Sequence, residues 1–574
     1  MAEYGAASRM TQSHPQRSVA RWVMDRESAL RDATQMWLPD WQDITSLLAP
    51  MCADTVTPHA PGESRTRQIF DSTGVHALQK LAANLQGEVT NSALEWHRLR
   101  LWDEQLSDDQ ETNAWLSTVN RHHMNIYNGS NFYQSMHTFY LNYAAFGTAA
   151  LFISDGQPSQ VGYLPRVNFH PVPHGTYVIG DNADGIVRTF IRRCRFTPVQ
   201  AWQMFAGHCS QKTMERLQNP TLMDVPYTYL HGVWEREDWE PGSQNNKKFP
   251  IASAYIELET QHLCDESGYL EWPVPVARWE KLTDSPWGFG LGHMALPDVR
   301  TINLMKELQI QMLTLWVQPP LKQVAESVFG AVSLEPLAVN IVKRPDDLSV
   351  FDLGGRPDLV QISQADLRMS INDVFFVNAL DALPSPEQGN MTAYEVSQRI
   401  GMRARLLGPA FHRLLVEVLS PMIDRVFGLE WRKHQIPVPP QQVIDAAQRH
   451  QGNIDIEYQG PLAKAQRSTD VSAIAQIYAI GTQMAQATQR LQVFDVLDED
   501  LALRRAADAA SVPLELVRDA MAVSKMRAAR QVAQEQATQL GQLQQGAQSL
   551  GQVAPFLRAL QSQPQPGQSQ GVAA

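Results

Sequence analysis

The sequence predicts an α+β protein that is mainly helical and contains more than one structural region. Apolar residues recur at helical spacing in several long segments, from about residue 18 to about residue 545. Between about 150 and 280 the pattern changes to short β-rich runs separated by turn residues. At 574 residues the chain is also too long for one simple hydrophobic core, which favours two or more regions.

Composition and charge narrow the class of protein. With 44% hydrophobic and 19% charged residues the chain has the composition of a soluble folded protein, and its longest apolar run is too short to span a membrane. The first 22 residues lack the apolar core of a secretion signal, so we expect an intracellular product. A formal net charge of −12 argues against a protein that grips nucleic acid by neutralising phosphates, but not against one that DNA merely passes.

The first hundred residues predict two helical segments and a strand. Residues 18–50 have helical spacing, and a second helix follows Asp71 or Ser72 as its N-cap. We expect one apolar face on this second helix, with Leu81 beside it; its residues are Val75, Leu78, Ala82, Leu85 and Val89. The stretch "SALEWHRLRL" then alternates like a β-strand.

The next region changes from helical to β-rich. Residues 107–150 are expected to be helical and end in the apolar run "FYLNYAAFGTAALFI". Residues 176–196 contain two β-rich runs joined by an Asn/Asp/Gly turn, which predicts a hairpin. Thr197 and Pro198 then have the residue types of a helix cap and first turn.

The second half of the chain is mainly helical. Pro297 is predicted to open a helix that Pro319 and Pro320 close; a mixed segment and a helix over 362–380 follow. Thr392 and Glu395 form a capping box at the start of an apolar stripe of nearly forty residues, which predicts a long helix. Gly408-Pro409 and Ser420-Pro421 should kink it. Residues 470–545 are Ala- and Gln-rich and helical, and the low-complexity C-terminus is predicted to be disordered.

No catalytic, cofactor or metal site is predicted. The chain has no phosphate-binding G-x-x-x-x-G-K-[ST] motif, and the glycine-rich "PWGFGLGHM" does not follow an apolar strand in a βαβ unit. His122 and His123 lack a third ligand in helical register, so we interpret them as surface or interface residues. Residues 498–500 are three carboxylates that suit the first turn of a helix. The four cysteines are expected to be free thiols.

Three collinear segments give the sequence its most specific signal. The first has the spacing A-x-x-x-L-A-x-x-L followed by W-x-x-L; its residues are Ala77, Leu81, Ala82, Leu85, Trp96 and Leu99. The second, residues 278–321, has an Arg-Trp pair, a glycine-rich segment, "ALPD", an Asn-bearing helix and a Pro-Pro-Leu exit. The third is the long helix that begins "TAYEV". Together they resemble the portal proteins, or head-to-tail connectors, of short-tailed, podovirus-type bacteriophages, over about residues 18–545.

The resemblance implies a ring, usually of twelve subunits, at one vertex of a phage capsid. It implies a subunit with an α/β wing, a two-helix stem, a small α/β clip, a long kinked wing helix and a helical crown. The matched segments assign 1–297 to the N-terminal and β-rich wing, 298–318 to the first stem helix, 319–361 to the clip, 362–380 to the second stem helix, 381–391 to a tunnel loop, 392–469 to the long wing helix and return strand, 470–550 to the crown and 551–574 to a disordered tail.

Two candidate functional segments follow from this resemblance. The tunnel loop is acidic and has no Lys or Arg; its candidate residues are Asp381, Pro384, Pro386, Glu387 and Gly389. Twelve copies at −12 each would give the ring a formal charge of about −144, and an acidic lumen would let DNA slide rather than stick. In the clip, Lys322, Lys343 and Arg344 are candidates for contact with DNA or an acidic partner. Solvated surface charge is the alternative interpretation of all these charged residues.

The resemblance also implies partners and a location. These are other copies of the chain as a dodecamer, the major capsid and scaffolding proteins, the terminase large subunit, tail adaptor proteins and the double-stranded DNA in the channel, with no membrane. The expected location is the capsid vertex of the virion, after assembly in the host cytoplasm. Two alternatives remain open: a tail adaptor, although adaptors are generally smaller and have no role for a long kinked helix, and a packaging enzyme, which the missing phosphate-binding motif disfavours.

Overall fold

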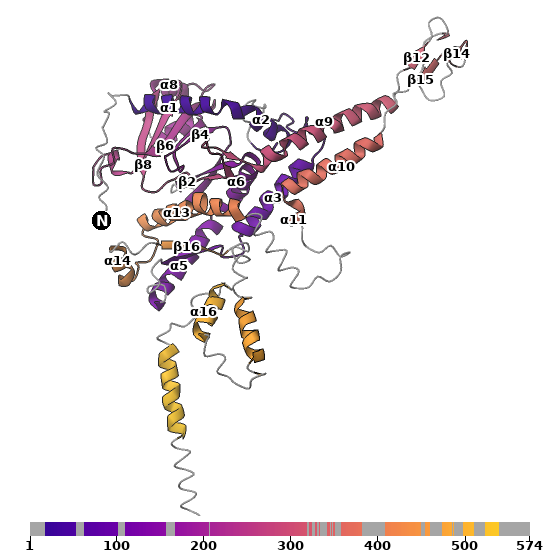
Figure 1. Cartoon of the computed structure of the whole chain (residues 1–574). Helices are drawn as coiled ribbons and strands as arrows, with labels where there is room; N and C mark the ends of the chain where they lie inside the picture. Colours follow the sequence, from indigo (N-terminus) through magenta and orange to yellow (C-terminus); the bar gives the residue numbers. More distant parts are fainter. Residues whose placement is uncertain are drawn as a thin grey trace, which may run out of the picture. The chain divides into compact units, whose positions relative to one another are not determined.

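A computed structural model confirms that the chain is α+β and mainly helical in the part that it describes. The described residues are 18–52, 62–101, 109–156, 167–205, 207–317, 321–323, 328–329, 332, 341–344, 346, 348–350, 357–380, 408–448, 454–459, 473–484, 486, 498–509 and 523–538. The chain divides into two units (Figure 1). Unit 1 comprises Met1–Arg98, Val119–Pro437 and Ile456–Val493, and unit 2 comprises Leu99–Thr118, Val438–Asp455 and Phe494–Ala574.

The helical segment expected over 18–50 is broken into three elements, α1 (Val19–Ala33), η1 (Gln35–Trp37) and α2 (Leu38–Leu47). Ser18 caps α1, with its hydroxyl oxygen 3.4 Å from the backbone N–H of Arg21. The break follows Thr34, whose hydroxyl donates to the carbonyl of Arg31 at 2.7 Å. A proline in the first turn of α2, where its missing N–H has no cost, restarts the helix.

The predicted second helix is α3 (Thr73–Val89), and its expected apolar face is confirmed apart from its first residue. Val75 is only partly buried, because the inward-facing residue of the first turn is Gly74, which packs on Leu48 and Val299. The carboxylate of Asp71 accepts from the backbone N–H of Thr73 at 3.0 Å, so Asp71 rather than Ser72 supplies the side-chain cap. The expected strand is β1 (His97–Leu101), in a two-stranded sheet with β16 (Ile454–Tyr458).

The apolar run predicted to end a helix near residue 150 is in fact divided between a helix and a strand. After α5 (Gln110–Asn128), α6 (Phe132–Phe146) ends at Gly147, whose φ of 69° is the left-handed conformation that terminates helices. The rest of the run forms β2 (Thr148–Asp155), with its first six residues buried. Hydrophobicity alone could not separate the two elements, because a buried helix and a buried strand are both continuously apolar.

The two larger antiparallel sheets among the described residues lie within unit 1. The smaller has the order β3-β2-β9, with β3 at Val167–Val172 and β9 at Val276–Arg278. The larger follows chain order, and its strands are β4 (Tyr177–Asp181), β5 (Val187–Phe196), β6 (Tyr227–Glu235), β7 (Ile251–Glu257) and β8 (His262–Tyr269). The hairpin predicted over 176–196 is confirmed as β4–β5, with Val178 opposite Ile191.

Short helices cover the larger sheet (Figure 1). Residues of α1 share one apolar core with four of its strands, and α7 (Pro198–Phe205) contributes Ala201 and Phe205 to a second core. The predicted cap of α7 is confirmed, since the Thr197 hydroxyl oxygen lies 3.3 Å from the backbone N of Gln200. After α8 (Gln211–Gln218) the remaining small elements are η2 (Asn246–Lys248), β10 (Glu280–Lys281) and β11 (Gly288–Phe289).

The glycine-rich segment is a packing joint, not a nucleotide loop. A Cβ atom built on Gly290 would lie 2.2 Å from the backbone N of Gly147, and one on Gly292 would lie 2.1 Å from the carbonyl oxygen of Ala145. The backbone N–H of Gly288 donates to the hydroxyl of Thr148 at 2.8 Å. These glycines are needed because two backbones meet here at the junction of α6 and β2.

The first predicted stem helix is α9 (Leu291–Val317), which begins seven residues before the expected start at 298. Pro297 therefore lies inside this helix rather than opening it. The earlier start is stabilised by burial, since Leu291, Ala295 and Leu296 are all buried. The second is α10 (Pro357–Val374), followed by α11 (Val377–Leu380).

Between α9 and α10 the described residues of the predicted clip form two small antiparallel pairs, β12 (Leu321–Gln323) with β15 (Leu348–Val350) and, between them in sequence, β13 (Val328–Phe329) with β14 (Ile341–Val342). We call these two strand pairs the clip hairpins.

The long helix is described from residue 408 onward, so its predicted capping box lies outside the described residues. Residues 408–414 are helical and continue through a π-helical segment, η5 (Leu415–Leu419), into α13 (Ser420–Arg432). The π segment lies directly before the predicted kink at Ser420-Pro421, and a π-bulge is one of the known causes of helix kinks. The turn before Gly408 and Pro409, where the other kink is expected, lies outside the described residues.

Unit 2 contains α14 (Gln441–Gln448), α16 (Glu499–Ala509) and a helix over 523–538. The carboxylate run lies at the start of α16 as expected, and Asp498 accepts from the backbone N–H of Leu501 at 3.0 Å. Arg527 contacts Asp500 through two hydrogen bonds of 2.6 and 2.7 Å. Within the described residues of both units, every helix is too short or too polar to cross a membrane.

Candidate functional site

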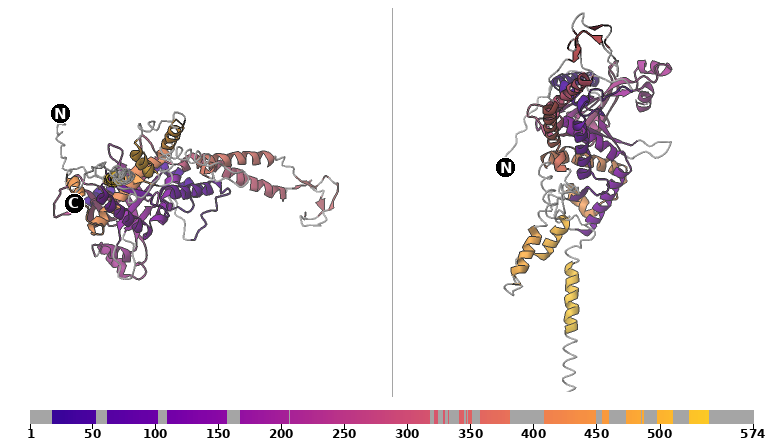
Figure 2. Two further views of the ribbon diagram at one scale, coloured as in Figure 1. Left: turned by 90° about the horizontal axis from the view of Figure 1, so that it is seen from below. Right: turned by 90° about the vertical axis from the view of Figure 1, so that its right-hand side faces the viewer.

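The candidate site is the antiparallel pair formed by α9 and α10, together with the clip hairpins at its outer end. Figures 1 and 2 both show the two helices side by side, with the clip strands beyond the C-terminus of α9. The Gln364 side chain donates to Gln309 at 3.1 Å across the pair, and the Ser370 hydroxyl donates to Asp298 at 2.6 Å. Polar bonds therefore fix the register of two helices that are far apart in the sequence.

Asn303 attaches α9 to the segment that leads into α3. Its side-chain oxygen accepts from the backbone N–H of Phe70 at 2.7 Å and of Asp71 at 3.3 Å, and its amide donates to the carbonyl of Gln68 at 2.8 Å. One side chain thus satisfies three backbone groups that no helix or sheet would satisfy. The Asn303 side chain therefore holds the predicted Asn-bearing helix, α9, against the segment that leads into α3.

Arg368 attaches α10 to the same place. Its guanidinium donates to the Asp71 carboxylate at 2.7 and 3.2 Å. Burial acts to raise the pKa of Asp71, but hydrogen bonds from Thr73 and Arg368 outweigh it and hold this pKa below the ordinary value. Asp71 therefore caps α3 and binds α10, so the start of α3 is the common anchor of both helices of the pair.

A third anchor joins α9 to α2. Arg300 contacts two carboxylates, that of Asp40 at 3.0 Å and that of Asp43 at 2.5 Å. These groups are exposed, so the stabilisation is small. The anchors also affect the net charge of the helix pair. Arg300 of α9 and Arg368 of α10 are both neutralised by carboxylates of the same subunit.

The predicted clip residues are described, and all three side chains are exposed. Lys322 lies in β12, paired with Ser349 of β15, and Lys343 and Arg344 follow β14. They therefore belong to the same small β region, as expected from the sequence. The predicted tunnel-loop residues Asp381, Pro384, Pro386, Glu387 and Gly389 lie outside the described residues.

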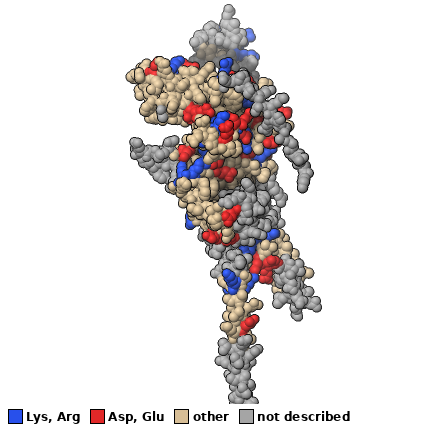
Figure 3. Space-filling model, turned by 90° about the vertical axis from the view of Figure 1, so that its left-hand side faces the viewer, with Lys and Arg blue, Asp and Glu red and all other residues tan. Residues whose placement is uncertain are grey.

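Charges of both signs are mixed over the surface. On the face drawn in Figure 3, Lys and Arg lie among Asp and Glu and do not form a continuous basic stripe. In the outer part of α9, residues 308–317 contain no charged residue at all, whereas α10 carries three aspartates and one arginine. Neither helix has the cluster of cations that tight phosphate binding needs.

Sequence reasoning also missed the contact that joins β9 to the π segment. Arg278 in β9 donates to the Glu417 carboxylate from its guanidinium at 2.6 and 3.1 Å, and from its backbone N–H at 2.8 Å. Glu417 lies in the π segment, where the backbone N–H of Ser420 bonds back to the carbonyl of Leu415. The Tyr458 hydroxyl also donates to that carbonyl, at 3.4 Å. The signal in the sequence was the proline that follows, but proline does not specify a π-helix.

The interpretation of His122 and His123 was half wrong. His122 is partly exposed and bonds the buried Glu430 at 3.0 Å, whereas His123 is fully buried against His97, with ring centroids 5.9 Å apart. Burial, and to a smaller extent His122, lowers the pKa of His123 to about 3. No cluster of three metal-ligating side chains exists among the described residues.

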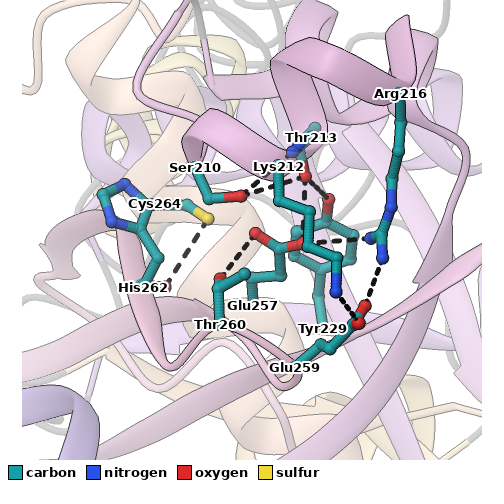
Figure 4. A network of polar contacts seen from close by, with 10 residues as sticks. All are labelled: Ser210, Lys212, Thr213, Arg216, Tyr229, Glu257, Glu259, Thr260, His262 and Cys264. Carbon is teal, nitrogen blue, oxygen red and sulfur yellow. Dashed lines mark hydrogen bonds and ion pairs between the residues drawn. The ribbon is translucent and has the colours of Figure 1, made fainter. Parts of the chain in front are cut away.

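The polar network between α8 and the larger sheet is structural (Figure 4). Glu257 is fully buried and accepts from Thr213 at 3.0 Å and from Thr260 at 2.8 Å, and the guanidinium of Arg216 lies 3.5 Å away. Arg216 also contacts Glu259, as does Lys212. Because these contacts satisfy the buried carboxylate and join α8 to β7, the network fixes the helix on the sheet rather than forming an acid–base centre.

Comparison with known proteins decides the family. The profile of the family described as "Bacteriophage head to tail connecting protein" matches residues 21–517, which includes α9, α10 and their anchors. The chain belongs to this connector family. It is also 26% identical over 542 residues to a probable portal protein of Bordetella phage BPP-1, covering 92% of this chain and 95% of that protein. A portal protein of Salmonella phage epsilon15 is 26% identical over 532 residues, covering 89% and 92%.

Among solved structures, one chain from the virion of a native gene transfer agent particle aligns with this chain at 11% sequence identity. The alignment covers 71% of this chain and 86% of that chain. The TM-score of that alignment is 0.29, which is too low to support any argument about the fold.

Proposed function

We propose that this connector-family chain is a portal subunit, which forms the channel at one capsid vertex through which double-stranded DNA is packaged and ejected. The observation that carries the proposal is the family match over residues 21–517, together with near full-length similarity to two phage proteins named as portal proteins. The α9–α10 pair, a long helical projection from unit 1 with a small β clip at its end, suits a channel wall more than an enzyme.

In this proposal the elements have the following roles. The N-terminal and β-rich region up to residue 290 is the wing, α9 and α10–α11 are the two stem helices, and residues 318–356 are the clip. Residues 381–391 are the tunnel loop, the helix that includes η5 and α13 is the kinked wing rod, and residues 470–550 are the crown. The anchors at Asp71, Asn303 and Arg278 support these roles, because they fix both stem helices and the rod to the wing.

We further propose that the subunits form a closed ring, with twelve copies as the expected number. The supporting observation is that the outer half of α9 exposes six large aliphatic side chains in the single subunit, which would be covered by neighbouring copies. In the virion the ring would contact the major capsid and scaffolding proteins. The clip residues Lys322, Lys343 and Arg344 would contact the terminase large subunit and then tail adaptor proteins.

The tunnel-loop proposal rests on sequence and family. Asp381 and Glu387 place carboxylates in a segment without cations, which would keep DNA from binding to the channel wall. We expect a protein without catalysis of its own, since the sequence contains no phosphate-binding loop and the described residues contain no metal-ligating cluster. The chain covers 92–95% of the length of two portal-named proteins, which favours a portal over a tail adaptor.

Electron microscopy of the purified protein, with ATPase and nuclease assays beside it, tests this proposal. Rings with a central hole and no turnover are the expected result. A monomeric protein, or ATP hydrolysis that follows the protein peak through stringent purification, would contradict it.

A further inference from the structure

The outer half of α9 has two apolar ridges on opposite sides of the helix. Ridge A consists of Leu304, Leu308 and Leu315, which are 55%, 53% and 43% exposed. Ridge B consists of Ile310, Leu313 and Val317, which are 45%, 46% and 81% exposed. At 3.6 residues per turn the centres of the two ridges are about 190° apart around the helix axis.

The other two sides of α9 differ from the ridges. The side between the ridges that faces α10 contains Ile302, which is buried, Gln309, which bonds Gln364, and, near the end of the helix, Trp316, which is 42% exposed. The opposite side is polar and includes Glu307 and Thr314. The helix thus has α10 behind it, a polar front and two apolar flanks.

Two separate apolar flanks indicate two neighbours for each subunit. A single self-complementary patch would suffice for a two-fold dimer, whereas different patches on opposite sides produce a head-to-tail contact, which forms a ring when the rotation between successive copies closes. The flanks also match in kind, since each is a row of three aliphatic residues without a charge among them. Helices that pack through such rows have axes about 8–10 Å apart.

We infer that ridge A of one copy packs against ridge B of the next copy, so that α9 is the helix through which neighbouring subunits meet. This inference rests on the proposed ring but goes further, because it assigns the residues and the direction of the contact. It also leaves the polar front and the outer face of α10, which carries Asp366 and Asp373, as the surfaces not used between copies.

Cysteine cross-linking of the full-length chain tests the assignment. Leu308 and Ile310 lie on opposite ridges but are only about 3 Å apart along the helix axis, so they reach the same level in neighbouring copies. The L308C and I310C variants are prepared separately, one with an added tag that changes its size, and then mixed before assembly and oxidation. The wild-type chain, whose four native cysteines are all free thiols, is the background control.

The expected result is a covalent pair that contains one copy of each variant, at least tenfold above the wild-type background and above either variant alone. Cross-linking of L308C with itself would overturn the inference, because it would show a self-complementary contact. Rings visible by microscopy without the mixed pair would also overturn it while leaving the proposed function intact. If neither variant nor the wild type forms rings, the proposed function itself fails.

Substitution provides a second, independent readout. Changing Leu308 or Ile310 to Glu should reduce ring formation at least tenfold, since a carboxylate would be buried between apolar rows. Unfolding of the subunit should be unchanged, because both side chains are exposed in the single chain. Thr314→Glu on the polar front is the matched control and should form rings normally; loss of rings in this control, or rings in both ridge variants, would contradict the assignment.

Discussion

The ion pair between Arg278 and Glu417 is predicted to be one of the strongest single contacts of unit 1. The Arg278 side chain is 5% exposed and that of Glu417 is 18% exposed, so the pair is largely removed from water. Replacing Glu417 by Met would leave the Arg278 cation buried, with one backbone N–H also losing its acceptor. Breaking a buried pair on one side costs about 3–5 kcal/mol, and we expect the lower end here because Glu417 retains some solvent contact.

The assay is urea unfolding followed by tryptophan fluorescence, using Glu417→Met, Arg278→Met and the double variant. Each single variant should lose about 3 kcal/mol of unfolding free energy, while the double variant should be no less stable than Glu417→Met, because it removes the unpaired charge as well. Glu417→Gln, which keeps an oxygen to accept from the backbone N–H, should lose less than Glu417→Met. Losses that simply add in the double variant, to within about 0.5 kcal/mol, would refute the reasoning.

Three other predictions concern pH, the tunnel loop and the clip. Because burial holds His123 neutral with a pKa of about 3, the unfolded state binds more protons than the folded state as pH falls below about 6.5. The contribution of His123 to stability should therefore decrease by about 2 kcal/mol between pH 7.5 and pH 5, in addition to the losses from the other buried histidines, and His123→Phe should lower the total loss by that amount in urea titrations. Changing Asp381 and Glu387 to Lys should slow DNA passage several-fold without preventing ring assembly, because cations in the channel would bind phosphates. The measurements are packaged genome length and ejection rate. Virions that package and eject DNA like wild type would show that this loop does not line the channel. Reversing the charge of Lys322, Lys343 and Arg344 should weaken docking of the motor or adaptor to preformed rings at low salt. Equal binding of wild-type and variant rings would show that these three cations do not take part in docking.

The sequence predicted the elements whose pattern is local. The α3 helix, the β4–β5 hairpin and the cap of α7 all follow from spacing and turn residues within a few positions. The apolar run after Tyr143 was misassigned because a buried helix and a buried strand look alike, and only the left-handed Gly147 separates them. The start of α9 was misplaced because tertiary burial of Leu291 and Leu296 extends the helix past Pro297.

The candidate site was predictable only in part. The three cations Lys322, Lys343 and Arg344 could be assigned to one small region, because they lie in sequence between two helices that the sequence predicts. The joint of Asn303, Asp71 and Arg368 could not, since Asp71 is more than two hundred residues away from the other two in sequence and no local pattern relates them. The burial of His123 was missed for a similar reason: the rings of His97 in β1 and of Phe427 in α13 pack against it from outside its own helix.

The most direct test of the whole account is single-particle electron microscopy of the full-length chain, with symmetry determined from the images rather than imposed. The account predicts closed rings with an axial channel, in which the density of α9 from one subunit contacts α9 of the next and the clip hairpins lie at one end of the channel. Discrete particles without a central channel, or rings in which α9 is solvated on both flanks, would contradict it.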